Sequence, residues 1–225
     1  MDVSLNQQTY ERMKKDILTF VLKPGDPVSA RKIAERYEVS RTPAREALVR
    51  LQDEGMVEIY PQSKSEISRI DIRRIRQEWF VRKSLELGMV DSFFDKVREE
   101  DLREMEKEAE RLERIGDEPR THETSFEYLL CDDRFHGIIY RVAEEQLAAR
   151  IIGNTLPNYR RMRLLIDLDN INKDRTVDDH RKLVRLGQNR DREGFRSFLE
   201  NHLSHIIDDM RNLHEQFPEM FVKEL

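Results

Sequence analysis

Apolar residues recur at intervals of three and four positions through most of the chain, and this spacing limits what the chain can fold into. The first such stretch contains Tyr10, Met13, Ile17, Phe20 and Val21. It predicts an α-helix with one apolar face. Glycine and proline, which interrupt helices, supply only 8 and 7 of the 225 residues. The sequence therefore predicts a mostly α-helical fold, long enough for one large domain or two unequal ones.

The first seventy residues predict three short helices and a β-hairpin. Ser29 is placed to cap a second helix through Tyr37, and Ser40 or Thr42 to cap a third, which Gly55 ends. Apolar residues on both sides of a predicted turn at residues 61–65 indicate a two-stranded hairpin. Helices followed by such a hairpin make a winged helix-turn-helix. We assign it to residues 1–70 and expect it to be a separate domain.

The predicted third helix carries basic side chains on the side opposite its apolar face. Arg41 and Arg45 are four residues apart, so they project together. A guanidinium group can bind guanine or a phosphate through two hydrogen bonds, and Thr42 can add a phosphate or thymine-methyl contact. The stretch from Ser29 to Arg50 is basic, although the whole chain has a net charge of -5. Charge alone also fits a solvated helix face, but the spacing favours DNA binding.

Residues 71–225 show almost no strand pattern and predict an all-α antiparallel bundle of about six helices. Short links between the helices favour antiparallel neighbours. The predicted helices cover residues 71–95, 99–114, 123–145, 147–168, 176–189 and 191–215.

Polar residues interrupt the apolar faces of three of these predicted helices. Asp132 and His136 lie one turn apart in the third, His180 lies in the fifth and His202 in the sixth. An isolated inward histidine is usually a hydrogen-bonded core residue. Burying four such groups without partners would lower the free energy of unfolding by roughly several kcal/mol. A divalent metal ion bound by them removes that cost. Three imidazoles and a carboxylate suit zinc first, with nickel, manganese or iron as alternatives.

Arg82 and Glu86 interrupt the apolar face of the first bundle helix. They are spaced to form an ion pair within the helix. Alternatively, Arg82 binds the carboxylate of a small effector beside the metal. A second basic cluster, Arg160, Arg161 and Arg163, has no predicted orientation.

The segment PGDPVSARKIAERYEVSRTPAREALVRLQDEGMVEIYP resembles the DNA-binding domain of the GntR family of bacterial transcription regulators. The resemblance implies that Arg31, Arg41 and Arg45 contact operator DNA and that the wing reaches toward the minor groove. Wings of this family usually carry a glycine at the tip, where this chain has Lys64. A lysine there also suits a phosphate or the groove.

The second region resembles the FCD effector domain of the FadR-like branch of this family. The motifs that carry the resemblance are Asp132-Asp133-Arg134-Phe135-His136, Asp179-His180-Arg181, His202-Leu203 and Arg82-Lys83-Ser84-Leu85-Glu86. The resemblance implies a metal on the four donors, with coordination positions open to water or to a carboxylate effector. It also favours Arg82 as the effector ligand.

Together these patterns predict a homodimeric, metabolite-responsive transcription regulator that binds double-stranded operator DNA. Family resemblance favours repression over activation. No stretch is long and apolar enough to span a membrane, and the N-terminus does not have the pattern of a secretory signal. We therefore expect a cytoplasmic location. A DNA-binding dimer with a purely structural metal is the main alternative. A metal-dependent hydrolase or lyase is disfavoured because no acid or base is paired with the donors, so we expect no enzyme activity.

Overall fold

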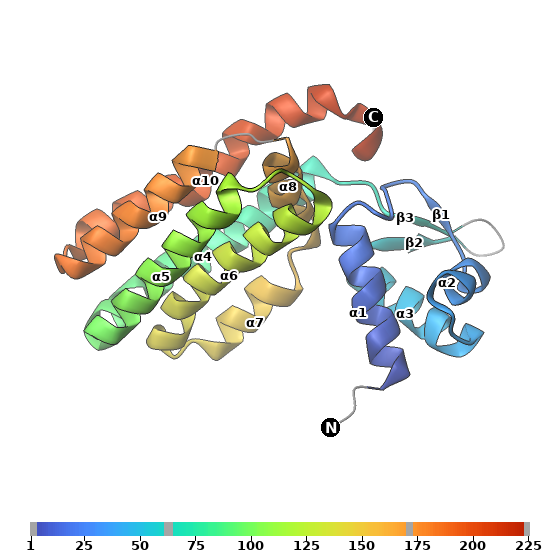
Figure 1. Ribbon diagram of the computed structural model, residues 1–225, viewed down its shortest axis with the longest axis horizontal. Helices are drawn as coiled ribbons and strands as arrows, with labels where there is room; N and C mark the ends of the chain where they lie inside the picture. Colours follow the sequence, from blue (N-terminus) through green and yellow to red (C-terminus); the bar gives the residue numbers. More distant parts are fainter. Residues whose placement is uncertain (1–3, 61–64, 170–172, 223–225) are drawn as a thin grey trace. The chain divides into compact units, whose positions relative to one another are not determined.

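The chain forms two compact units in the computed structural model, which describes residues 4–60, 65–169 and 173–222 (Figure 1). The first unit contains Met1–Ile72 together with His214–Leu225, and the second contains Arg73–Leu213. The mostly α-helical fold, with a winged helix-turn-helix followed by an all-helical region, is confirmed. The boundary between residues 70 and 71 stays a prediction.

The first unit combines three helices with a small antiparallel sheet. The helices are α1 (Leu5–Leu18), α2 (Ala30–Tyr37) and α3 (Arg41–Asp53). The sheet has the order β1-β3-β2, with β1 at Pro27–Val28, β2 at Val57–Ile59 and β3 at Ser65–Ile67. The predicted hairpin is β2 paired with β3. The sequence did not predict β1, because two residues are too few to show an alternating pattern. Lys64 lies outside the described residues.

Local chemistry fixes the ends of these helices. The Ser29 hydroxyl accepts a hydrogen bond from the Lys32 amide at 3.2 Å and caps α2, as predicted. Gly55, just after α3, has a φ of 74°, which favours glycine. The prediction that Phe20 and Val21 continue the first helix is wrong. The helix ends at Leu18, Phe20 has a φ of 56°, and Val21 is exposed.

The last described residues complete the first unit. A short 3-10 helix at Pro218–Met220 brings Phe221 beside Ile70 in a parallel bridge. The Ile70 amide donates to the Met220 carbonyl at 2.9 Å, and the Val222 amide donates to the Ile70 carbonyl at 3.0 Å. Phe221 is only 1% exposed, so it is part of the core of this unit.

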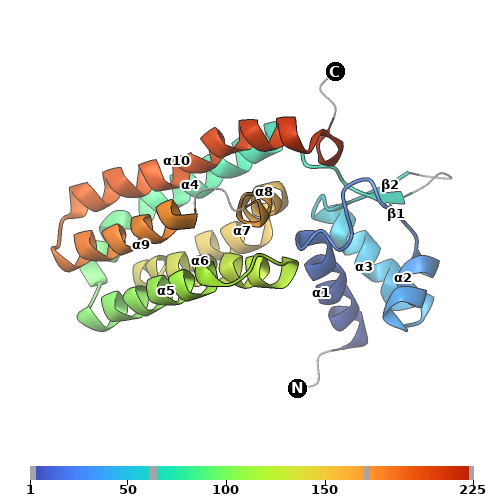
Figure 2. The ribbon, with the colours of Figure 1, turned by 45° about the horizontal axis from the view of Figure 1, so that its top comes forward.

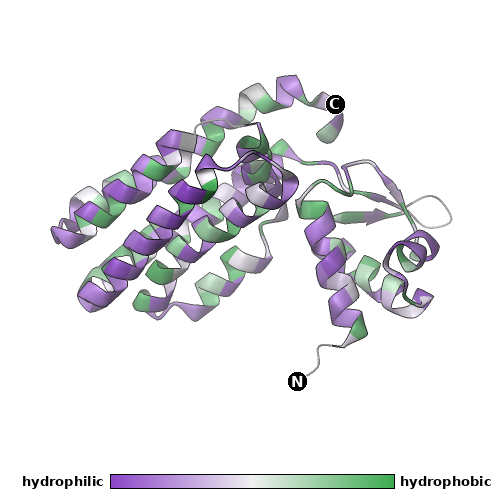
Figure 3. Cartoon of the chain, viewed as in Figure 1, coloured by the Kyte–Doolittle hydropathy of each residue, from purple (hydrophilic) through white to green (hydrophobic). Residues whose placement is uncertain are grey.

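The second unit is a helical bundle (Figure 2). Its helices are α4 (Ile72–Lys96), α5 (Glu99–Asp117), α6 (His122–Ala143), α7 (Gln146–Asn154), α8 (Pro157–Leu168), α9 (Lys173–Gln188) and α10 (Arg192–Gln216). Helix α5 packs against both α6 and α9. Figure 3 shows hydrophobic and hydrophilic residues alternating along these helices, as expected for helices with one buried face. No helix within the described ranges is long and apolar enough to cross a membrane.

The predicted single helix over residues 147–168 is wrong. The chain breaks it between Asn154 and Pro157, and two helices result. Pro157 has no amide hydrogen to donate and disfavours a helical conformation in the residue before it. It therefore fits the first turn of α8 better than the interior of a longer helix.

Candidate metal centre and nucleic-acid interface

Four predicted metal donors lie together inside the helical unit. Asp132 and His136 come from α6, His180 from α9 and His202 from α10. One ligand atom from each lies within 4.8 Å of the others. The two α6 residues meet because a spacing of four places both side chains on one face.

Each of the three histidines donates a hydrogen bond from Nδ1 to an acceptor. The Nδ1 of His180 donates to the Thr176 carbonyl at 2.7 Å, and this acceptor fixes the tautomer. The Nδ1 of His136 lies 2.7 Å from a Glu86 carboxylate oxygen, and that of His202 lies 2.9 Å from Asp179. Because Nδ1 of each ring donates its proton, Nε2 is the nitrogen that can bind a metal.

Two of these nitrogens lie near Asp132 but make no hydrogen bond with any described residue. Nε2 of His136 and Nε2 of His180 are buried and make no hydrogen bond within the described part of the chain. Leaving buried polar atoms unpaired costs about 1–3 kcal/mol each. Burial also lowers the pKa of His202 to about 4, although Asp179 opposes the shift, so this ring is neutral near pH 7. A neutral imidazole is the form of histidine that binds zinc and related divalent ions.

Asp132 is ionised despite its burial. Burial alone raises the pKa of this carboxyl, but Arg163 and His136 outweigh burial and hold the pKa well below its usual range. One oxygen of Asp132 lies 3.3 Å from Nε2 of His180, and the other is bound by Arg163. The carboxylate is therefore charged and directed at the imidazoles.

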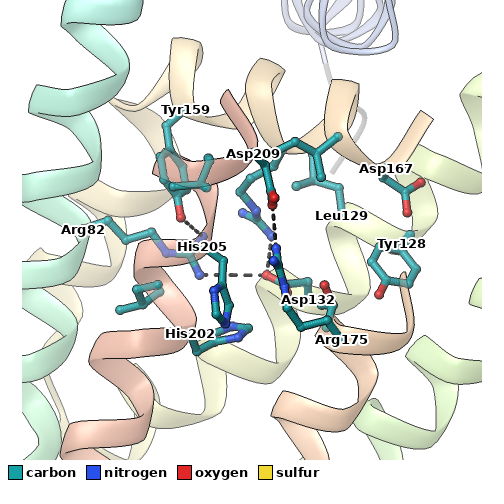
Figure 4. Close-up of a pocket in the computed structure, with 15 residues that line it drawn as sticks. Arg82, Tyr128, Leu129, Asp132, Tyr159, Asp167, Arg175, His202, His205 and Asp209 are labelled. Carbon is teal, nitrogen blue, oxygen red and sulfur yellow. Dashed lines mark hydrogen bonds and ion pairs between the residues drawn. The ribbon is translucent and has the colours of Figure 1, made fainter. Parts of the chain in front are cut away.

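A cavity of about 100 Å³ is lined by two of the four donors, Asp132 and His202 (Figure 4). The lining also includes apolar and aromatic side chains, the carboxylates Asp167 and Asp209, and three arginines. The arginines are Arg82 of α4, Arg163 of α8 and Arg175 of α9. Its volume is smaller than the roughly 300–1,000 Å³ of drug-sized sites, so it suits an acid of a few heavy atoms.

Arg82 forms the predicted ion pair within its helix and also lines the cavity. Its Nε donates to Glu86 at 2.5 Å, which is the pair predicted within the helix. Its other nitrogens face the cavity, with Nη2 3.8 Å from Asp132 and Nη1 3.5 Å from the Tyr159 hydroxyl. Burial by itself would raise the pKa of Glu86, but Arg82 and His136 lower it below its usual range.

Several residues of the centre were not predicted from the sequence. Glu86, Thr176 and Asp179 orient the imidazoles, and Arg163 binds Asp132. His205 also lines the cavity, with its Nε2 3.2 Å from Asp179. The only sequence signal for Arg163 was its place in a basic cluster of unknown orientation.

The predicted DNA contacts lie exposed on the winged unit. Arg41, Thr42 and Arg45 are exposed on α3, and Arg31 is exposed on α2. Arg50, also on α3, instead packs over the ring of Tyr10 at 3.6 Å from the centroid. The first set is therefore available to a ligand, whereas Arg50 supports the packing of α1.

Comparisons with known proteins agree with this organisation. Residues 5–67 match the family described as bacterial regulatory proteins, gntR family, and residues 79–205 match the FCD domain. The HTH-type transcriptional repressor RspR of Escherichia coli K12 is 27% identical over 221 residues, covering 98% of this chain and 95% of the relative. A transcriptional regulator from Streptomyces ambofaciens is 27% identical, covering 96% and 89%.

A solved structure shares the fold along nearly the whole chain. The McbR/YncC structure from E. coli has a TM-score of 0.75 at 21% identity and covers 96% of this chain and 100% of its own. The family matched by residues 5–67 and the relative RspR are transcription regulators, not enzymes. The chain therefore belongs to the GntR family of DNA-binding bacterial transcription regulators and carries an FCD domain after its winged helix-turn-helix.

Proposed function

We propose that this regulator is a homodimeric repressor whose helical unit binds a divalent metal ion, zinc first, and a small carboxylate effector. The observation that carries the proposal is the convergence of Asp132, His136, His180 and His202, with two buried imidazole nitrogens that make no hydrogen bond with any described residue. Repression is supported by the name of the relative RspR.

The metal would be held by the Asp132 carboxylate and by Nε2 of the three histidines. Glu86, Thr176 and Asp179 hold the rings in the tautomer that this requires. When bound, the metal supplies a positive centre at the wall of the cavity that attracts a carboxylate. The site lies between α6, α9 and α10, so its occupancy affects how these helices pack.

The effector would be a small organic acid bound in the cavity of about 100 Å³. Arg82 and Arg163 line this cavity, and a guanidinium group binds a carboxylate through charge-assisted hydrogen bonds. Binding changes DNA affinity only if the effector prefers one arrangement of the protein. A tenfold change in operator affinity needs about 1.4 kcal/mol, which one such contact made in a single state can supply.

Operator DNA would be read by α3 through Arg41, Thr42 and Arg45, with Arg31 on α2 and Lys64 of the wing as further contacts. We expect Arg45→Ala to weaken operator binding by roughly 1–3 kcal/mol. Arg50→Ala is the matched control, because Arg50 packs over Tyr10 on the same helix. Fluorescence anisotropy with operator and with random DNA measures both variants. An equal loss on both DNAs would identify a phosphate contact, and equal affinities for the two variants would contradict this interface.

Dimerisation accounts for a large exposed apolar residue. Phe80 on α4 is 62% exposed, which is unusual for an aromatic side chain of this size. Two copies of the winged unit would bind the two halves of a palindromic operator. Sedimentation velocity of the wild type and of Phe80→Asp tests this. A monomeric wild type would contradict the dimer.

The central experiment compares His136→Ala with His122→Ala. His122 is an exposed histidine of the same helix and serves as the control. We expect elemental analysis to give stoichiometric metal for the wild type and His122→Ala and none for His136→Ala. In the presence of zinc, acetate and lactate are then tested for an effect on operator affinity. Retained metal in His136→Ala would contradict the site. Metal binding with no response to any acid would favour the purely structural role.

A further inference from the structure

A second cavity lies in the helical unit on the other side of Arg82. It is formed by α6, α7 and α8 and has a volume of about 350 Å³, within the range of small-molecule sites. Its wall shares Arg82, Tyr159 and Arg163 with the cavity beside the metal centre. None of the four proposed metal donors is among the residues that line it.

Two glycines keep this cavity open. Gly137 lies in the middle of α6 and Gly153 near the end of α7, and both line the cavity. Neither has a positive φ, and a Cβ added at either position meets no atom within 4 Å. Neither backbone conformation nor close packing therefore requires glycine there. A glycine inside a helix costs about 1 kcal/mol relative to alanine, and here that cost leaves open space.

The lining has one polar end and an apolar body. The apolar part comes from Leu130, Ala149, Ile152 and Leu156 together with the glycines. At the polar end, Asp133 is shared between two arginines, with 2.8 Å to Arg160 Nη2 and 2.7 Å to Arg163 Nη1. Arg160 also donates from Nη1 to the Gly153 carbonyl at 3.1 Å. Its Nε is buried and has no hydrogen-bond partner among the described residues.

We infer that this cavity is a second ligand site, for a monocarboxylic acid whose apolar body is about the size of one aromatic ring. The carboxylate accepts from the free Nε of Arg160, and the ring lies against Leu130, Ile152 and Leu156. An unpaired buried N–H is satisfied by an anionic acceptor, and the apolar walls favour a ring over water. The inference does not depend on the metal.

The test uses the 225-residue chain in excess EDTA, so that no metal site contributes. Isothermal titration calorimetry measures binding of phenylacetate, of neutral phenylacetamide and of acetate, which lacks the ring. We expect phenylacetate to bind and the other two to bind at least about tenfold more weakly, a difference of about 1.4 kcal/mol. Phenylacetamide binding as tightly as phenylacetate would overturn the role of Arg160, and acetate binding as tightly would overturn the role of the apolar walls.

Filling the cavity should remove the site. Gly137→Leu and Gly153→Leu each place a side chain in the open space, so we expect phenylacetate affinity to fall at least about tenfold. Gly88→Leu is the matched control, since Gly88 is an exposed glycine in the middle of α4 with equal room. His205→Ala changes only the metal-side cavity and should leave the affinity unchanged.

The folding of each variant is checked by its melting temperature. Gly137→Leu is expected to be at least as stable as the wild type, because it fills space and replaces a helix glycine. Arg160→Met supplies a variant that leaves the glycines unchanged and should weaken phenylacetate. Undiminished binding in folded Gly137→Leu and Gly153→Leu would overturn the inference, as would a loss caused by His205→Ala instead.

Discussion

Each imidazole of the candidate metal centre contacts a residue that orients it. Asp179 accepts from His202 Nδ1 at 2.9 Å and also lies 3.2 Å from His205 Nε2. Such partners hold the ring in one tautomer and raise its basicity toward a metal. Burial by itself raises the pKa of Asp179, but His202 and His205 outweigh burial and lower it, so this carboxyl is ionised near neutral pH and acts only as an acceptor.

We expect Asp179→Asn to weaken zinc binding by about 10- to 100-fold, because an amide is a poorer acceptor and leaves the His202 tautomer free to change. Competition with a zinc chelator of known affinity measures this. Asp178→Asn is the control, since Asp178 is exposed on the same turn of α9. Equal zinc affinities for the two variants would show that His202 does not need its partner.

Sequence reasoning predicted the four residues that the structure brings together, but not the residues around them. Asp132, His136, His180 and His202 interrupt apolar faces, and helix spacing alone makes that visible. Glu86 gave a weaker signal, because its spacing from Arg82 suggested an ion pair and nothing linked it to His136. Asp179 contacts a residue 23 positions away on another helix. Such contacts depend on how helices pack, which a single sequence does not specify.

At the scale of elements, the end of α3 depends on one backbone conformation. Gly55 adopts a φ of 74° and lets the chain turn from the helix into β2. We expect Gly55→Ala to lower the free energy of unfolding by about 1–2 kcal/mol, because a side chain is strained in this region. Urea unfolding followed by circular dichroism measures the change.

Gly88→Ala should have the opposite effect. Gly88 lies inside α4, is exposed and has a non-positive φ, so alanine gains up to about 1 kcal/mol of helix stability. A loss at Gly55 accompanied by a gain at Gly88 would separate turn strain from helix propensity. Destabilisation of both variants by the same amount would contradict the role given to the left-handed turn.

The elements predicted from the sequence were those with long periodic patterns. Helices α4, α5 and α6 begin and end within a few residues of their predicted bounds. The break between α7 and α8 was missed, because the apolar spacing continues across Pro157. Strand β1 was missed because its two residues pair with β3, which lies far along the chain.

At the scale of the whole molecule, the metal should stabilise the helical unit. The donors come from α6, α9 and α10, and binding to the folded chain alone adds about 2.7 kcal/mol at a metal concentration 100 times the Kd. We expect zinc to raise the melting temperature in a concentration-dependent way and EDTA to reverse this. The effect should fade as the pH falls, since imidazoles must be neutral to bind metal.

Differential scanning fluorimetry follows this stabilisation. His136→Ala, titrated with zinc under the same conditions, shows how much of the shift comes from binding elsewhere. A melting temperature of the wild type that does not change with zinc would contradict a metal-stabilised bundle, even if the winged unit still bound DNA.

The pairing of Phe221 with Ile70 has a consequence for how the protein is made. The winged unit is synthesised first, yet one of its fully buried side chains leaves the ribosome only after the whole helical unit has been translated. Nascent chains that stop before Phe221 therefore lack one of the side chains that form the core of the winged unit. The core of the winged unit is therefore completed only at the end of synthesis.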